Sequence, residues 1–165
     1  MNNIAIQLIT MFGIGRISKI PGTIASFVTC LFYFLCMIFN INIIFLLISF
    51  FIILILSTIF INKYSSNFTE IDAKEIVIDE FLGQSIPIYL YEISHGTEKS
   101  ADEAIIFYCI CFVLFRFFDI VKPFPVSYFD KNFKNSFGVI MDDVCAGFYV
   151  VLTLICFMVL SSYFI

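Results

Sequence analysis

Three acidic sites stand where apolar sequence gives way to polar sequence. They are the pairs Asp79-Glu80 and Asp142-Asp143 and the single residue Asp119. Each pair follows an apolar triplet, and a glycine, Gly83 or Gly147, stands about one helical turn later. Small residues let neighbouring helices pack closely, so we expect the acidic sites to meet. Because carboxylates are costly beside membrane-length apolar sequence, they predict a functional site.

Each acidic site also has a structural explanation. Acids at helix starts cap free N–H groups and suit the helix dipole, which explains one acid of each pair if both pairs begin helices. Asp119 instead falls near an expected helix end, before Pro123, where a carboxylate opposes the dipole. Its structural alternative is an ion pair with Arg116, three residues earlier. A functional role is therefore favoured over a purely structural role most clearly at Asp119.

Converging carboxylates with few neutralising partners predict a divalent cation. Mg²⁺ is the expected ion, because it prefers oxygen ligands. A usual zinc site is not expected, since the only histidine, His95, stands in a distant polar stretch. The six cysteines lie in apolar stretches without metal-site spacing, so they read as small buried hydrophobes and not as a disulfide framework.

Basic residues near the acids suit a phosphate substrate. Arg116 offers a planar fork for phosphate oxygens, and Lys122 offers a compact charge. The rigid segment Lys122-Pro-Phe-Pro125 is expected to fix the approach of the lysine to Asp119. Sequence signatures of cysteine, histidine and aspartyl-phosphate phosphatases are missing, which leaves carboxylate–metal phosphoryl transfer as the best chemistry.

The stretch GIGRISKIPGT, residues 13–23, predicts a loop near the amino terminus. Its glycine backbone can approach an anion, and Arg16 and Lys19 bring positive charge. The alternative is a turn with charges that anchor the chain at a membrane face. Lys131 and Lys134 are expected to attract lipid headgroups.

Composition predicts one integral membrane domain over residues 1–165. The chain is 61% hydrophobic and 13% charged, against roughly 45–50% and about 25% in soluble domains. We expect an all-α, multi-helix bundle. Apolar helices are predicted near 24–39, 43–61, 104–118 and 144–165, with a shorter crossing at 79–93 broken by Pro87 and a surface helix within 62–78. A soluble bundle with these segments as its core is the alternative.

Charge predicts the orientation of the bundle. If 79–93 crosses, residues 1–23, 62–78 and 119–143 share one face, which then carries every basic residue except Lys99. The positive-inside rule makes that face cytoplasmic, with five crossings or deep half-crossings. The net charge of −4 and the lack of a basic stripe argue against nucleic acid as a partner. No cleavable signal peptide is expected in the first ten residues.

The sequence resembles the phosphatidylglycerophosphatase A family over nearly its whole length. The matching segments are GIGRISKIPGTIAS (13–26), IVIDEFLG (76–83), and FRFFDIVKPFPVSYFD (115–130) with GVIMDDVCAG (138–147). The block R-x-x-D-x-x-K-P-x-P followed by D-D-x-x-A-G is highly specific. Ser18-Lys19-Ile20 departs from the family pattern, so the resemblance specifies substrate contacts there less closely.

The resemblance implies an Mg²⁺-dependent phosphatase of the inner membrane that converts phosphatidylglycerophosphate to phosphatidylglycerol. It carries over Asp79, Glu80, Arg116, Asp119, Lys122, Asp142 and Asp143 as site residues. On this hypothesis Asp79, Asp119 and Asp142 bind metal, while Glu80 or Asp143 positions or deprotonates water. Arg116 and Lys122, with Arg16 and Lys19, hold the phosphate of a phospholipid substrate. A metal-dependent headgroup transferase and a small transport subunit are the alternative functions.

Overall fold

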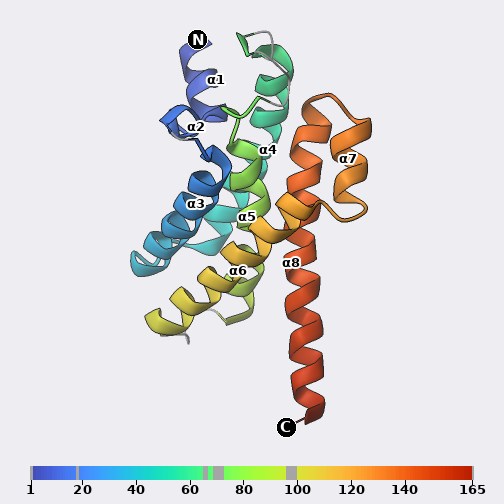
Figure 1. Cartoon of the computed structure of the whole chain (residues 1–165). Coiled ribbons are helices and arrows are strands. Elements are labelled where there is room, and N and C mark those ends of the chain that lie inside the picture. Colours follow the sequence, from blue (N-terminus) through green and yellow to red (C-terminus); the bar gives the residue numbers. More distant parts are fainter. Residues whose placement is uncertain (1, 18, 65–66, 69–72, 96–99, 165) are drawn as a thin grey trace.

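The fold of the chain is all-helical, as predicted. The computed structural model describes residues 2–17, 19–64, 67–68, 73–95 and 100–164, and no strand occurs among them (Figure 1). The helices are α1 (Asn2–Ile9), α2 (Ile14–Ile17), α3 (Pro21–Ile38), α4 (Ile43–Tyr64), α5 (Ile78–His95), α6 (Ala101–Val121), α7 (Val126–Asn132) and α8 (Ser136–Phe164). Ser18, Lys99, the side chain of His95 and part of the predicted 62–78 helix lie outside the described residues.

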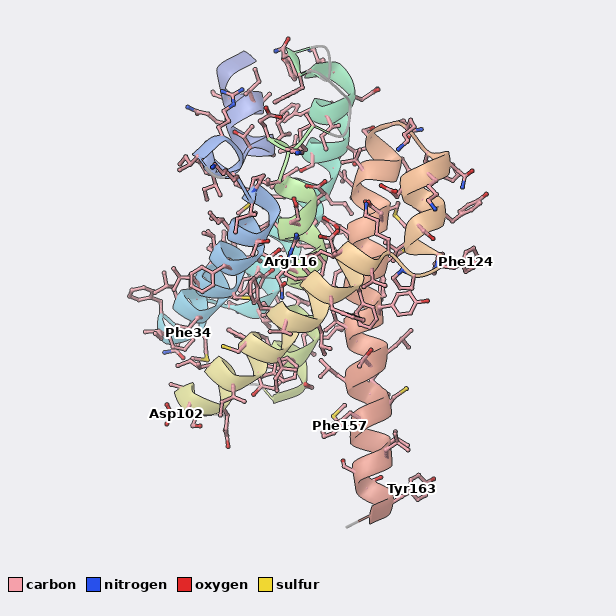
Figure 2. The ribbon with its side chains drawn as sticks, viewed as in Figure 1. Phe34, Asp102, Arg116, Phe124, Phe157 and Tyr163 are labelled. Carbon is pink, nitrogen blue, oxygen red and sulfur yellow. The ribbon has the colours of Figure 1, made fainter. Side chains whose placement is uncertain are left out.

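Four of the described helices, α3, α4, α6 and α8, are long and apolar enough to cross a membrane. Their outward faces carry large apolar side chains that no other part of the chain covers, such as Phe45, which is 68% exposed. Figure 2 shows Phe157 and Tyr163 projecting from the end of α8 that stands apart from the other helices. A soluble bundle would bury these faces, so the chain is a multi-pass membrane protein.

Helix α5 lies in the centre of the bundle and packs against α3, α4, α6 and α8. It is as long as a membrane span but carries Asp79, Glu80 and Glu92, and it is not among the four apolar spans. Gln84 and Ser85 near its middle are fully buried. The predicted short crossing at 79–93 is therefore a continuous helix surrounded by the others, and Pro87 does not break it.

Several predicted boundaries were wrong for identifiable reasons. Helix α3 begins with Pro21, a residue suited to a first helical turn, and the preceding loop contains the short helix α2. Helix α6 begins earlier than predicted because Ser100 and Glu103 form a capping box. The described part of the predicted surface helix consists of the end of α4, residues 67–68, and a segment over 73–77 that is not an α-helix.

Helix α8 also begins earlier than predicted, at Ser136. The side chain of Asn135 accepts a hydrogen bond from the Gly138 N–H at 3.0 Å, which caps the helix there. Asp142 and Asp143 therefore lie two turns inside α8. Capping consequently explains neither of these acids, in contrast to Asp79 and Glu80 in the first turn of α5.

Close packing of α5 on α8 depends on Gly83 and Gly147. A Cβ atom on Gly83 would lie 2.5 Å from the carbonyl oxygen of Asp143, and one on Gly147 would lie 2.4 Å from the carbonyl oxygen of Gly83. Both distances are shorter than a van der Waals contact, and backbone atoms cannot move aside as a side-chain end can. The two glycines thus draw the acidic segments together, as predicted.

Gly83→Ala is expected to lower the free energy of unfolding by about 1–3 kcal/mol, because the added methyl group forces the α5 and α8 backbones apart. Thermal unfolding of the purified protein in detergent micelles measures this change. Val159→Ile, which enlarges a half-exposed side chain farther along α8, is the matched control and should leave stability unchanged. Equal stability of the Gly83→Ala and parent proteins would contradict the assigned contact.

Candidate functional site

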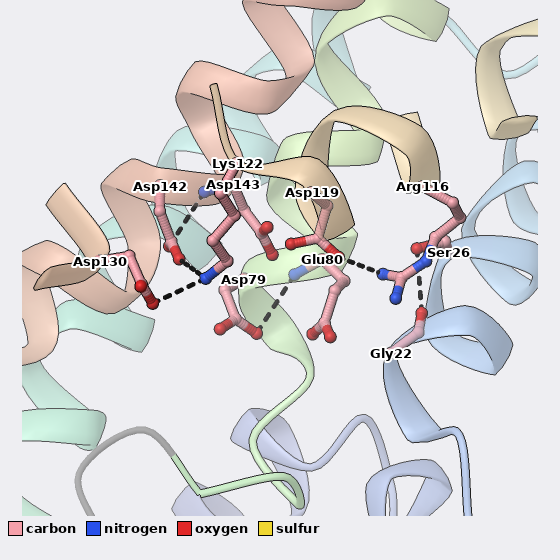
Figure 3. A network of polar contacts seen from close by, with 10 residues as sticks. All are labelled: Gly22, Ser26, Asp79, Glu80, Arg116, Asp119, Lys122, Asp130, Asp142 and Asp143. Carbon is pink, nitrogen blue, oxygen red and sulfur yellow. Dashed lines mark hydrogen bonds and ion pairs between the residues drawn. The ribbon is translucent and has the colours of Figure 1, made fainter. Parts of the chain in front are cut away.

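Helices α5, α6 and α8 bring the predicted acids together (Figure 3). Asp79 and Glu80 come from the start of α5, Asp119 from the end of α6, and Asp143 from the second turn of α8. Carboxylate oxygens of Asp79, Glu80 and Asp143 lie within 4.8 Å of one another. Asp79 and Asp143 are buried, so three carboxylates from two helices share a space with little water.

Asp119 faces this group from the third helix. Figure 3 shows the carboxylates of Asp119 and Asp143 pointing toward one another. Asp119 also forms an ion pair with Arg116, with 2.7 Å between Oδ2 and Nη1, so the partner expected from i, i+3 spacing is present. Nε of Arg116 is buried without a hydrogen-bond partner among the described residues. Arg116 therefore keeps donor capacity beyond its ion pair with Asp119.

Asp142 has a different environment from its neighbour Asp143. Its Oδ2 accepts a hydrogen bond from Nζ of Lys122 at 2.8 Å, and the same Nζ donates to Asp130 on α7 at 2.7 Å. Consecutive residues on a helix point about 100° apart, so only one of the pair can face the cluster. The acids nearest one another are therefore Asp79, Glu80 and Asp143, in place of the predicted trio Asp79, Asp119 and Asp142.

Lys122 joins α7 to α8 and does not approach Asp119 as predicted. It is the C-cap of α6 in a left-handed backbone conformation (φ 46°), which turns its side chain toward α7 and α8. Burial alone would lower the pKa of Lys122, but the bonds to Asp130 and Asp142 outweigh burial and raise it. The sequence did not indicate Asp130, because its separation from Lys122 does not correspond to a contact within one helix. The two residues meet only because α7 folds back on α8.

The start of α3 closes another side of the site through Gly22. A Cβ atom at this position would lie 2.0 Å from Oε1 of Glu80 and 3.2 Å from Nη1 of Arg116. A side chain at this position would displace Glu80 or Arg116, so glycine leaves both side chains room where α3 begins. Oε2 of Glu80 is buried and has no hydrogen-bond partner among the described residues. An orphaned carboxylate oxygen in a group of three carboxylates fits a bound cation.

A cleft of about 520 Å³ opens on the cluster. Its walls are residues 19–23 before and within α3, residues 73, 74 and 76 before α5, and Asp79, Glu80, Arg116 and Ile120. Lys19 therefore reaches the site, whereas Arg16 lines an adjoining cleft. Lys74 lines both clefts and was not predicted as a site residue, because it stood in a polar stretch with no recognisable motif.

The arrangement suits the binding of an anion with the help of a cation. Five carboxylates, of Asp79, Glu80, Asp119, Asp142 and Asp143, gather with two cationic side chains, Arg116 and Lys122. Such an excess of buried negative charge is unfavourable unless a further cation or protons neutralise it. The described ligand atoms of the closest group are all oxygen, which fits a hard divalent ion.

Sequence comparison identifies the family to which the chain belongs. The profile of the phosphatidylglycerophosphatase A family matches residues 7–158. A phosphatidylglycerophosphatase A of Haemophilus influenzae is 58% identical over 41 residues, which are 25% of each chain. One of Escherichia coli is 28% identical over 141 residues, which are 82% of this chain and 73% of the relative.

A third relative carries a different name. A protein of Bacteroides thetaiotaomicron, named as a proposed phosphatidylinositol-3-phosphatase, is 40% identical over 88 residues. The match spans 53% of this chain and half the length of that relative, and the Haemophilus match spans a quarter of its relative. No solved structure matches the chain. Because the family profile covers nearly all of the sequence, including every acid of the cluster, the chain belongs to the phosphatidylglycerophosphatase A family.

Proposed function

We propose that the protein hydrolyses the terminal phosphate monoester of phosphatidylglycerophosphate and releases phosphatidylglycerol and orthophosphate. The observation that carries the proposal is the meeting of carboxylates from α5, α6 and α8 beside Arg116, in a cleft where membrane-length helices end. Family membership supports the activity, and the relatives from Haemophilus and Escherichia carry that name. The acyl chains remain in the bilayer while the headgroup enters the cleft.

Arg116 and the carboxylates divide the chemistry between them. Arg116 binds oxygens of the terminal phosphate and stabilises the charge that develops on them. Asp119 orients Arg116 through their ion pair. Glu80 or Asp143 positions a water molecule and accepts its proton as the water oxygen attacks phosphorus. The bond between phosphorus and the glycerol oxygen breaks, and that oxygen takes up a proton to become the hydroxyl of phosphatidylglycerol.

Mg²⁺ is the proposed cofactor. Asp79, Glu80 and Asp143 are placed to hold it, and Asp119 faces the same space. Asp142, an expected ligand, is held by Lys122 at 2.8 Å and serves the site by fixing the start of α8 against α7. When bound, a divalent cation draws negative charge from the phosphate and orients it toward water. The site faces the cytoplasm of the inner membrane on this proposal, because Arg16, Lys19 and Lys74 line the cleft at the site or the cleft beside it.

A phosphatidylinositol phosphate is the second candidate substrate, favoured by the name of the Bacteroides relative. Both substrates are lipids with a phosphate monoester, so the carboxylates and Arg116 suit either. Purified protein supplied with each lipid in turn distinguishes them by the rate of orthophosphate release. A headgroup transferase would release no free phosphate, and a transport subunit would act on neither lipid.

Asp119→Asn is expected to reduce phosphate release by at least about 100-fold, because it removes the charge that orients Arg116 and faces the cluster. Colorimetric phosphate release from phosphatidylglycerophosphate in mixed micelles measures the effect, and thermal unfolding checks that the variant is folded. Asp102→Asn makes the same change in the exposed first turn of α6 and should retain full activity. Near-normal turnover by Asp119→Asn would contradict the proposed site.

Removal of divalent cations is expected to abolish phosphate release, because the carboxylates of the cluster then repel both one another and the substrate. Activity is measured after treatment with a chelator and again after Mg²⁺ is restored. Restoration by Mg²⁺ supports the cofactor, whereas full activity in excess chelator would exclude it. Asp143→Asn should raise the Mg²⁺ concentration needed for half-maximal activity, and Asp130→Asn, outside the close group, should not.

Lys122→Gln is expected to lower the free energy of unfolding by about 1–3 kcal/mol, because Asp142 loses a charged donor. A double-mutant cycle with Asp142→Asn tests the pair, and the double variant should recover part of the loss. Since the pKa of Lys122 is raised, the pair stabilises the protein below the ordinary lysine pKa, and the stabilisation disappears only as pH rises through the raised value. Strictly additive effects of the two substitutions would contradict the interaction.

A further inference from the structure

A second cleft adjoins the one that opens on the acidic cluster. It has a volume of about 500 Å³ and is lined by Gly15, Arg16, Lys19, Pro21, Lys74 and Glu75. Lys19, Pro21 and Lys74 line both clefts, so the two spaces are neighbours that share a wall of two lysines and a proline. We call the cleft that opens on the acidic cluster the inner cleft and the adjoining cleft the outer cleft.

The outer cleft carries an excess of positive charge. Among the residues that the structure describes, the charged side chains lining it are Arg16, Lys19, Lys74 and one acid, Glu75. Within the same residues, none of these three cations forms an ion pair. Three basic side chains around one concave space suit a multivalent anion. The inner cleft differs, since Asp79 and Glu80 line it and offset its cations.

Backbone contacts hold the walls of the outer cleft together. A Cβ atom on Gly15 would lie 2.0 Å from the carbonyl oxygen of Glu75, so α2 packs directly against the segment before α5. The N–H of Val77 donates to the carbonyl oxygen of Ile9 at 3.0 Å and ties the same segment to α1. These contacts bring Arg16 and Lys74 to one cleft, although the two residues are far apart in the sequence.

Position separates the roles of the two clefts. The inner cleft includes Ile20 and Ile120, which are 60% and 71% exposed and form an apolar lip where α3 begins and α6 ends. A lipid can enter across that lip with its acyl chains in the bilayer. Every charged residue of the outer cleft precedes α3 or α5 and lies outside the four candidate spans. The outer cleft therefore opens on the water side of the site.

We propose that the outer cleft is a second phosphate-binding subsite, in which Arg16, Lys19 and Lys74 bind a phosphate group next to the one being hydrolysed. The inference rests on the proposed phosphatase function and extends it. Its position on the water side fits released orthophosphate on its way out of the inner cleft. The second phosphate of phosphatidylglycerophosphate, a diester one glycerol unit away from the reacting monoester, has the same chemistry, and the experiment distinguishes these two sources.

The test compares Lys74→Gln, Lys19→Gln and the double variant with Lys63→Gln. Lys63 is exposed in the last turn of α4 and lines neither cleft, so the control has the same charge change. Removing one exposed cation–phosphate contact should weaken phosphate binding about 2- to 5-fold, and the double variant should lose more. Three steady-state constants are measured for each protein. They are the inhibition constant of orthophosphate, KM for phosphatidylglycerophosphate, and KM for phosphatidic acid, which has one phosphate.

A rise in the inhibition constant with KM unchanged identifies released orthophosphate as the ligand. A rise in KM for phosphatidylglycerophosphate without a rise for phosphatidic acid identifies the lipid diester. Unchanged constants in the Lys74→Gln and Lys19→Gln proteins, or equal changes in the Lys63→Gln control, would overturn the proposal. Direct binding of radiolabelled orthophosphate to purified parent and Lys74→Gln proteins, in excess chelator, tests the subsite without turnover. A parent that hydrolyses no lipid but loses phosphate binding on Lys74→Gln would refute the proposed function and retain the subsite.

Discussion

The contact between Gly83 on α5 and Gly147 on α8 is the constraint on which the rest of the structure depends. A Cβ atom on either glycine would collide with a backbone carbonyl oxygen of the facing helix, so glycine at both positions lets the two backbones come this close. The carboxylates of Asp79, Glu80 and Asp143 lie about one turn from this contact. Any wider spacing of α5 and α8 would move the carboxylates of Asp79 and Glu80 away from that of Asp143, and the cluster would not form.

This closeness has an electrostatic cost that the surrounding helices reduce. Arg116 pairs with Asp119 on α6, and Lys122 bridges Asp142 and Asp130. Lys122 lies directly after the last turn of α6, where the helix dipole also favours positive charge, and Arg116 lies in the turn before the last. The remaining carboxylates keep an excess of negative charge, and that excess is what makes the site suitable for a divalent ion and for phosphate chemistry.

On the proposed function, the position of the site at the ends of spans lets it take a substrate from the lipid and release a product to water. The apolar lip of Ile20 and Ile120 is then on the side where the lipid enters. The basic residues of the outer cleft stand beyond the spans, among segments that belong to the water side. On the proposed function, a lipid substrate and a water-soluble product use different openings of one site, so the acyl chains need never leave the bilayer.

The sequence by itself determined the helical membrane class, the residues of the acidic cluster and the meeting of its glycines. These features depend on local composition and on short spacings, such as the apolar runs and the repeated pattern of an acidic pair followed by glycine. The early start of α8 was also encoded locally, in the Asn135 cap, but went unrecognised.

Only the tertiary structure decided which acid faces which partner. Asp142 and Asp143 are neighbours in sequence, yet one binds Lys122 and the other joins Asp79 and Glu80, because α7 folds back to supply Asp130 and a helix turns each residue about 100° from the last. Lys74 likewise became a cleft residue through the contact of Gly15 with Glu75. Such pairings depend on the relative placement of distant segments, which no periodicity within a single segment encodes.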